Sequence, residues 1–365
     1  MRDNITTQRI SAVRNLLNEW RVEAVYITSE TNRRWLSGFT GSNGQLLITK
    51  EHALLATDFR YWEQAQQQAP AYTLFKHQRT TEDTVQFFTE TGATRIGIEA
   101  NHLTLQAATD LKNNNALSHL TWVPLPQTVE SLRAVKNSDE IAAIQAAAAI
   151  TDHTMSQVNL LARPGISEKE LAWELEKVMR DAGAEATAFT LIVASGPNSA
   201  LPHHRPGKRL LQAGDTIVVD MGAQLDGYKS DLTRSFYLGS EPNEQFWAVY
   251  NKVLEAQTAV IQQTRPGMTC KEIDGIARNM INAAGHEEHF GHGLGHGLGL
   301  DIHETPFLSP RSDSTILSPN MITTIEPGIY LPGWGGIRIE DLTYCTEDGL
   351  ALLSHCPKVP IIPVR

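Results

Sequence analysis

Two predicted strands each end in a carboxylate and a glycine, and a second acidic residue follows each strand. The sequence therefore contains two pairs of acids. Asp220 closes the first strand and Asp231 comes 11 positions later, whereas Glu326 closes the second and Glu340 comes 14 positions later. A strand, a turn and a returning strand would set the acids of each pair side by side. A single acid at such a place is more often a turn former without a ligand role. Two matching pairs instead predict a binding site.

Four carboxylates gathered in a core cannot all stay ionised alone, because mutual repulsion and loss of water both raise their pKa values. Divalent metal is the natural compensation. Two ions about 3.5–4 Å apart would satisfy four carboxylates and leave room for a bridging water. The sequence therefore predicts a dinuclear site that includes Asp220, Asp231, Glu326 and Glu340.

Five of the 13 histidines fall within residues 286–303. The first four are spaced by three or four residues, which on a helix would suggest a zinc site. Glycine at every second position around them would defeat a helix, so we expect an extended strand with close backbone neighbours. On that strand His292 and His296 share a face, and His286 and His289 are expected in solvent. One histidine with four carboxylates favours Mn²⁺ or a similar hard ion over structural zinc.

An internal repeat relates the segments that carry the acids. A 21-residue segment starting at Arg163 recurs without a gap 102 positions later, with seven identical positions. Ser167 and Thr269 are the predicted N-caps of the two repeat helices, and Gly183 and Gly285 suit the left-handed position that ends them. The repeat predicts one domain of two similar halves about a pseudo-twofold axis, which would bring both acid pairs to one place.

Composition excludes several functions. The chain has 365 residues, a net charge of −10 and three distant cysteines. The negative balance argues against a nucleic-acid partner, because phosphate binding needs a concentrated basic face. The cysteines form no disulfide framework or zinc site, so a reducing compartment is expected. Since no signal peptide or membrane span is evident either, we expect a cytoplasmic protein without a membrane partner.

Two domains are expected, with a boundary near a proline-containing linker at residues 122–128. Residues 1–130 alternate between helical and strand patterns, including a hairpin over 45–49 and 53–56. Residues 131–365 begin with an alanine-rich helix over 138–157 and contain the repeat. The fold class is therefore α/β (α+β), with a small first domain and a larger duplicated one.

The second domain resembles the pita-bread metallopeptidases, which include aminopeptidase P, prolidase and methionine aminopeptidase. The likeness runs from about Ser138 to Pro357. Residues 1–130 resemble the creatinase/prolidase-type N-terminal domain, with 38–44 and 57–61 as landmarks. The whole chain is most similar to short two-domain bacterial Xaa-Pro peptidases. The matching motifs are Asp220-Met-Gly-Ala, Gly227-Tyr-Lys-Ser-Asp231-Leu-Thr-Arg234, Gly295-His296-Gly-Leu-Gly, Ile302-His303-Glu304, Ile325-Glu326-Pro-Gly-Ile-Tyr330 and Gly336-Ile-Arg338-Ile-Glu340-Asp341.

This resemblance implies a role for each metal ligand. Asp220 would chelate one ion, Asp231 and Glu340 would bridge both, and His296 with Glu326 would complete the other. The cofactors implied are two divalent metal ions, with Mn²⁺ expected and Co²⁺ or Zn²⁺ as alternatives. A metal-bridging hydroxide would attack the peptide carbonyl.

The resemblance also implies residues that act on the substrate. Glu326 would move the proton, and His303 and His203 would be catalytic groups that bind the tetrahedral intermediate. His204 is the weaker alternative to His203. Two further side chains, Arg338 and Tyr228, would orient a ligand or the substrate.

The activity implied is an exopeptidase of aminopeptidase P type that hydrolyses the Xaa-Pro bond at the N-terminus of peptides. The close alternative is an Xaa-Pro dipeptidase (prolidase), which needs a cation for the substrate carboxylate; Arg205 or Arg311 could supply it. A metal-free creatinase-like hydrolase or a non-enzymatic binding module is the remaining alternative, which the intact ligand set disfavours. Short proline-containing peptides and a second copy of the chain, as a homodimer, are the expected partners.

Overall fold

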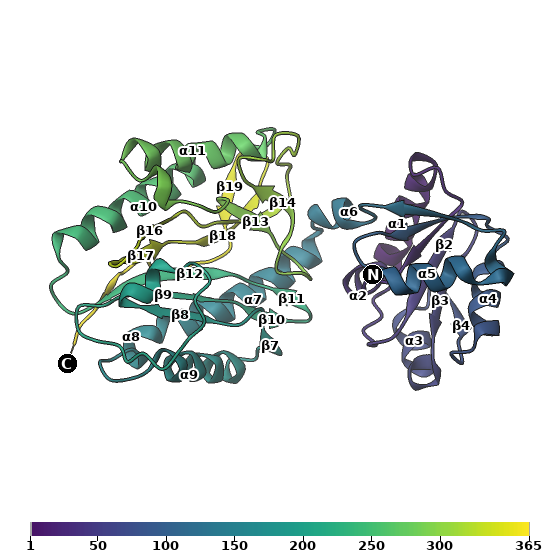
Figure 1. The fold of residues 1–365 in the computed structure, drawn as a ribbon, viewed down its shortest axis with the longest axis horizontal. Coiled ribbons are helices and arrows are strands. Elements are labelled where there is room, and N and C mark those ends of the chain that lie inside the picture. The colour runs from purple at the N-terminus through teal and green to yellow at the C-terminus, as the bar shows by residue number, and fades with distance from the viewer. Residues whose placement is uncertain (1, 365) are drawn as a thin grey trace. The chain divides into compact units, whose positions relative to one another are not determined.

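The computed structural model describes residues 2–364 and divides into two compact units, Met1–Arg133 and Ala134–Arg365 (Figure 1). Sequence patterns place the division at about residue 130, inside the short helix α6 (Glu130–Ala134) that spans it in the structure. Of the helices described, none combines the length and the apolar character needed to cross a bilayer.

The first unit is built on one six-stranded mixed sheet in the order β4-β3-β2-β1-β5-β6. The predicted hairpin is confirmed, since β2 and β3 pair antiparallel. β1, β5 and β6 run parallel to one another, as alternating strands and helices allow. The strands are β1 (Ala24–Ile27), β2 (Gln45–Thr49), β3 (Ala53–Thr57), β4 (Thr73–Lys76), β5 (Arg95–Glu99) and β6 (Thr121–Leu125); the helices are α1 (Arg2–Glu19), α2 (Glu30–Ser37), η1 (Phe59–Tyr61), α3 (Trp62–Gln68), α4 (Thr81–Thr89), α5 (Leu105–Asn113) and η2 (Asn115–Leu117).

The second unit combines long helices with short, mostly antiparallel sheets (Figure 1). Its helices are α7 (Ser138–Ser156), α8 (Val158–Leu161), α9 (Glu168–Asp181), η3 (Gly196–Ala200), α10 (Glu244–Gln263), α11 (Cys270–Ala283) and η4 (Glu287–His289). Its strands are β7 (Ala186–Thr187), β8 (Ile192–Ser195), β9 (Thr216–Met221), β10 (Ala223–Leu225), β11 (Tyr228–Lys229), β12 (Leu232–Leu238), β13 (Gly295–Gly297), β14 (Glu304–Leu308), β15 (Ile322–Ile325), β16 (Gly328–Leu331), β17 (Gly335–Arg338), β18 (Asp341–Cys345), β19 (Leu350–Leu352) and β20 (Ile361–Ile362).

The repeat helices α9 and α11 begin and end alike, as the sequence predicts. Ser167 and Thr269 each form a capping box with the glutamate three positions on, which satisfies free N–H groups of the first turn. Gly183 and Gly285 follow the helices with φ of 105° and 84°, a backbone conformation that side chains disfavour. The two N-caps also form matching antiparallel bridges, with Leu210 and Ile316 respectively. The repeated sequence therefore has a repeated local structure.

Each half of the second unit has its own hydrophobic core. α9 packs buried side chains such as Leu171 and Leu175 against Val219 of β9. α11 packs side chains such as Ile273 and Ile281 into a separate cluster with strands β15–β17. Both helices carry apolar residues on one face, which accounts for this one-sided packing.

Two strand ladders place the acids. β9 pairs with β12 so that Asp220 lies opposite Thr233, with Asp231 just before β12. The chain between these acids forms the small hairpin β10–β11. In the other half, the β15–β18 ladder ends at Ile325 and Asp341, and the β16–β17 ladder resumes at Gly328 and Arg338. Glu326 and Glu340 occupy the break between these two ladders.

The glycine-rich segment forms a strand only over Gly295–Gly297, shorter than expected. There the close approach is confirmed, because a Cβ on Gly295 would lie 2.0 Å from the Thr324 carbonyl oxygen. The segment before it is irregular because side chains of α11 hold its backbone. Arg278 donates to the carbonyls of Phe290 and His292, and Asp274 accepts from a following backbone N–H.

Candidate metal centre

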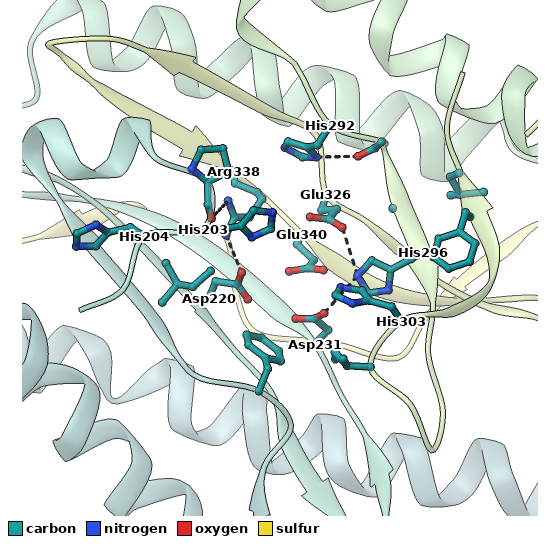
Figure 2. Close-up of a pocket in the computed structure, with 18 of the residues that line it drawn as sticks. His203, His204, Asp220, Asp231, His292, His296, His303, Glu326, Arg338 and Glu340 are labelled. Atoms are coloured by element: carbon teal, nitrogen blue, oxygen red, sulfur yellow. Dashed lines mark hydrogen bonds and ion pairs between the residues drawn. The ribbon is translucent and has the colours of Figure 1, made fainter. Parts of the chain in front are cut away.

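Acidic side chains from both halves of the second unit face one another in a single cluster (Figure 2). Asp220, Asp231 and Glu340 each place a carboxylate oxygen within 4.8 Å of the others. All three residues are at most 9% exposed. One oxygen of Asp220 and one of Asp231 (Oδ1 in each) are buried without a hydrogen-bond partner among residues 2–364. Buried acceptors are normally satisfied, so these orphaned oxygens mark an incomplete site.

His296 and Glu326 complete the cluster on its other side. The Nε2 atom of His296 lies 3.6 Å from Asp231 Oδ2 and 3.5 Å from Glu326 Oε1. Two threonines form hydrogen bonds with residues of the cluster. Thr233 donates to Glu340 Oε2 at 2.7 Å, and Thr324 accepts from the His296 backbone N–H at 3.0 Å. Asp231 thus lies close both to the other two acids, Asp220 and Glu340, and to His296.

The electrostatics of the cluster oppose a full set of charges. Burial, followed by repulsion from Glu340, raises the pKa of Asp231 well above its usual range. Burial and the charge of Glu326 do the same to the pKa of Glu340, and burial raises the pKa of Glu326 to about 8. Burial also lowers the pKa of His296 to about 4, which keeps the ring neutral and able to ligate.

These residues fit divalent metal ions. The donors are carboxylate oxygens with one neutral imidazole, two acceptors lack any partner, and the acids repel one another. A dication would satisfy the orphaned oxygens and remove the repulsion in one step. The five predicted ligands are therefore brought together in one place.

Arg338 links this cluster to residues behind it. Its guanidinium donates to Asp220 Oδ2 at 2.6 Å, to Thr233 Oγ1 at 3.1 Å and to the hydroxyl of Tyr330 at 2.9 Å. The Tyr330 hydroxyl also lies 2.9 Å from Nε2 of His292. Arg338 thus contacts Asp220, one of the predicted ligands, as the family resemblance implies. Sequence reasoning gave no role to Tyr330 or, beyond sharing a face with His296, to His292.

A cavity of about 660 Å³ opens beside the cluster, within the range of small-ligand sites. Its walls include both predicted catalytic histidines, His203 and His303, and the alternative His204. The His303 ring packs edge-on against His296 at 4.3 Å between centroids. Arg205 lines the cavity, whereas Arg311 is not among the described residues that do. The other lining residues are Phe189, Thr190, Ile192, Pro202, His292, Gly293, Gly295, Ile302, Phe307, Leu308, Ser309, Arg338 and the five acidic and histidine residues of the cluster.

Three of the residues singled out in the sequence lie away from the cavity or are less exposed than expected. Tyr228 is not among the cavity-lining residues; its hydroxyl donates to Glu140 at 3.0 Å and its ring packs beside Ile144 of α7. The Asp220–Asp231 hairpin turns this side chain toward the helix. His286 and His289 lie around η4, where they are half-buried against each other instead of fully in solvent.

Comparison with known proteins identifies the family of the chain. Residues 142–347 match metallopeptidase family M24, and residues 9–135 match the creatinase/prolidase N-terminal domain. An uncharacterised peptidase of Bacillus subtilis, YqhT, is 42% identical over 97% of this chain and 99% of its own length.

Solved structures give the same result. An Xaa-Pro dipeptidase from Bacillus anthracis superposes with a TM-score of 0.94 at 39% identity, over 98% of this chain and 99% of the other. An X-Pro aminopeptidase from Thermotoga maritima superposes with a TM-score of 0.88 at 34% identity, over 97% and 100%. The chain therefore belongs to metallopeptidase family M24, and its pita-bread catalytic domain follows a creatinase/prolidase-type N-terminal domain in the sequence.

Proposed function

We propose that the chain is an exopeptidase that hydrolyses the Xaa-Pro bond of short peptides. The observation that carries this proposal is the cavity, which joins the acidic cluster to His203 and His303. The names of the Bacillus anthracis and Thermotoga maritima proteins support proline as the residue after the cleaved bond. Proline's tertiary amide has no N–H and fixes φ, so a shaped site can distinguish it from ordinary peptide bonds.

The proposed ligands are Asp220, Asp231, His296, Glu326 and Glu340, and the donor set favours Mn²⁺, with Co²⁺ or Zn²⁺ as alternatives. When bound, such ions acidify a water molecule and polarise the peptide carbonyl. Arg338 holds Asp220 through its hydrogen bond and so fixes the direction of that carboxylate.

The remaining steps belong to side chains that face the cavity. Glu326 can take up a proton on its carboxylate and release it to the departing imino nitrogen. His203 and His303 can donate hydrogen bonds to the oxygen that gains charge. Among residues 2–364 we find no hydrogen-bond partner of the His203 ring, so both ring nitrogens are available to a peptide.

Arg205 favours dipeptides as substrates. It lines the cavity and is exposed, so its guanidinium can bind a free carboxylate directly after proline. The second candidate is an aminopeptidase P type activity on Xaa-Pro-Yaa peptides. The cavity volume favours it, since about 660 Å³ accommodates more than a dipeptide.

A peptide panel tests the proposed function. Metal-stripped protein is reloaded separately with Mn²⁺, Co²⁺ or Zn²⁺ and offered Xaa-Pro, Xaa-Pro-Yaa and Met-Yaa peptides. We expect release of the first residue from the proline peptides, highest with Mn²⁺, and the lengths cleaved distinguish the two candidates. Preferential cleavage of Met-Yaa would show that the site is not selective for proline.

Replacing Arg205 tests the dipeptide preference. We expect Arg205→Ala to raise KM for Xaa-Pro roughly tenfold to a hundredfold, since a hydrogen bond to a charged group contributes about 1.5–3 kcal/mol. Xaa-Pro-Yaa should be affected less, because its carboxylate lies farther along the chain. Arg311→Ala is the matched control, since Arg311 does not line the cavity. Equal effects of Arg205→Ala on both peptides would contradict carboxylate binding.

A further inference from the structure

A buried glutamate outside the metal cluster binds both ends of a cavity-lining segment. Glu168, at the start of α9, is 0% exposed. Its Oε1 accepts hydrogen bonds from the backbone N–H and hydroxyl of Ser195, both at 2.8 Å, and from the Asn198 amide at 2.9 Å. Its Oε2 accepts from the Gly207 N–H at 3.1 Å and lies 2.8 Å from His204 Nε2. One carboxylate therefore holds the segment of residues 195–207 by hydrogen bonds at both of its ends.

The fastened segment carries four residues that line the cavity. They include His203 and Arg205, the groups we assign to the peptide carbonyl and carboxylate. His204 contacts Glu168, and Figure 2 shows its ring away from the acidic cluster, on the opposite side of the segment from His203. Pro202 and His203 lie at the centre of a turn, which the His204 N–H closes by donating to the Leu201 carbonyl at 3.1 Å. Holding His204 therefore also holds the turn that carries His203. The two histidines thus have different tasks.

Comparison with α11, the equivalent helix of the other half, shows that such a helix can begin without a carboxylate at the position of Glu168. The position 102 residues after Glu168 is Cys270, which is buried in an apolar cluster. Both positions nevertheless make the same backbone contacts. The N–H of Glu168 donates to the Arg209 carbonyl at 3.0 Å, and that of Cys270 donates to the Thr315 carbonyl at 2.8 Å. The side-chain bonds of Glu168 are an addition made in the first half alone.

We propose that Glu168 is a positioning residue for peptide binding, which acts by fixing His203 and Arg205 at the cavity. Five hydrogen bonds to one buried carboxylate restrain the segment in addition to its backbone contacts, and bonds to a charged acceptor are the stronger kind. The peptide then meets side chains already in place, without the cost of ordering them. This inference rests on the proposed function, because the substrate groups are those of an Xaa-Pro peptide.

Glu168→Gln tests the proposal. A glutamine can still accept from Ser195, but its amide nitrogen then faces the Gly207 N–H, which loses its acceptor. We expect hydrogen exchange of the Gly207 amide to become on the order of tenfold faster. KM for Xaa-Pro should rise roughly tenfold with a smaller change in kcat, because binding is lost more than chemistry. Bound metal should match the wild type.

Glu170→Ala is the matched control. It removes the capping box of the same helix, so it destabilises α9 without touching the segment. We expect a lower Tm but unchanged KM and unchanged exchange at Gly207. If Glu168→Gln does not fold, Asn198→Ala removes one of the five bonds and should give the same changes at smaller size.

The outcomes separate this inference from the proposed function. Exchange is measured without peptide, so it reports on the segment whether or not Xaa-Pro is the substrate. Unchanged exchange in Glu168→Gln would overturn the fastening, and changed exchange with wild-type KM would overturn the effect on binding. If the panel reveals another peptide class, KM for that peptide decides the second point.

Discussion

Asp231→Asn should abolish peptidase activity while stabilising the metal-free protein. Asp231 lies close both to the other two acids and to His296, so its loss removes the carboxylate that the two ions would share. Metal stabilisation of several kcal/mol corresponds to on the order of a thousandfold in rate. We therefore expect kcat/KM to fall by about that factor or more, with metal content by mass spectrometry showing loss of at least one ion.

The stability effect has the opposite sign. Burial and neighbouring acids raise the pKa of Asp231, so its charge destabilises the folded metal-free protein at neutral pH. Asparagine keeps the shape without the charge, and we expect the metal-free variant to be more stable by about 1 kcal/mol or more. The difference should shrink as pH falls, because protonated Asp231 no longer repels its neighbours. Thermal unfolding in EDTA at several pH values measures this.

The activity and the metal-free stability of Asp231→Asn each test a separate part of this prediction. Asp220→Asn provides a comparison, because that carboxylate also receives a hydrogen bond from Arg338 and its charge is partly compensated. We expect a smaller gain in metal-free stability there. Full activity of Asp231→Asn would mean that this acid is no ligand, and a less stable metal-free variant would mean that repulsion does not dominate the cluster.

Lys136→Met should destabilise the catalytic unit strongly. The Lys136 ammonium lies 2.7 Å from Glu304 Oε1, and the two side chains are 1% and 6% exposed. Removing one member of a buried ion pair leaves the other charge uncompensated and costs about 3–5 kcal/mol. For a unit of this size that corresponds to a decrease in Tm of roughly 6–20 °C. Thermal unfolding followed by circular dichroism measures it.

The double variant Lys136→Met/Glu304→Gln should recover most of this loss. It removes both charges, and replacing a whole buried pair is often nearly neutral. Because Glu304 follows His303 directly, the single variant should also lower kcat. Recovery of kcat in the double variant would show that the position of His303 does not depend on the ion pair itself. A single variant as stable as wild type would show that the contact contributes little.

The sequence predicts helices and turns best where interactions between neighbouring residues determine them. The capping boxes at Ser167 and Thr269 and the left-handed Gly183 and Gly285 follow from a few neighbouring residues. The 19-residue helix α7 was expected from its composition, although its cap is Asn137, one position before the predicted start.

The site required more than local signals. The spacing of acids predicted their pairing, because hairpins bring strand ends together. Tyr330 and His292 could not be assigned, since their contact joins residues 38 positions apart through tertiary packing. The contact of Tyr228 with Glu140 of α7 likewise joins distant residues, 88 positions apart, and no local signal predicts it. Glu168 gave no signal at all, because a first-turn glutamate ordinarily stabilises its helix and needs no further role.

The two separate cores of the catalytic unit show that its proposed metal ligands are distributed over two halves. Asp220 and Asp231 belong to the half with the α9 core, and His296, Glu326 and Glu340 belong to the half with the α11 core. Neither half contains all five proposed ligands, so the proposed metal site forms only where the two halves meet. Ions bound there would join the two halves, and their binding free energy would add to the stability of the folded catalytic unit.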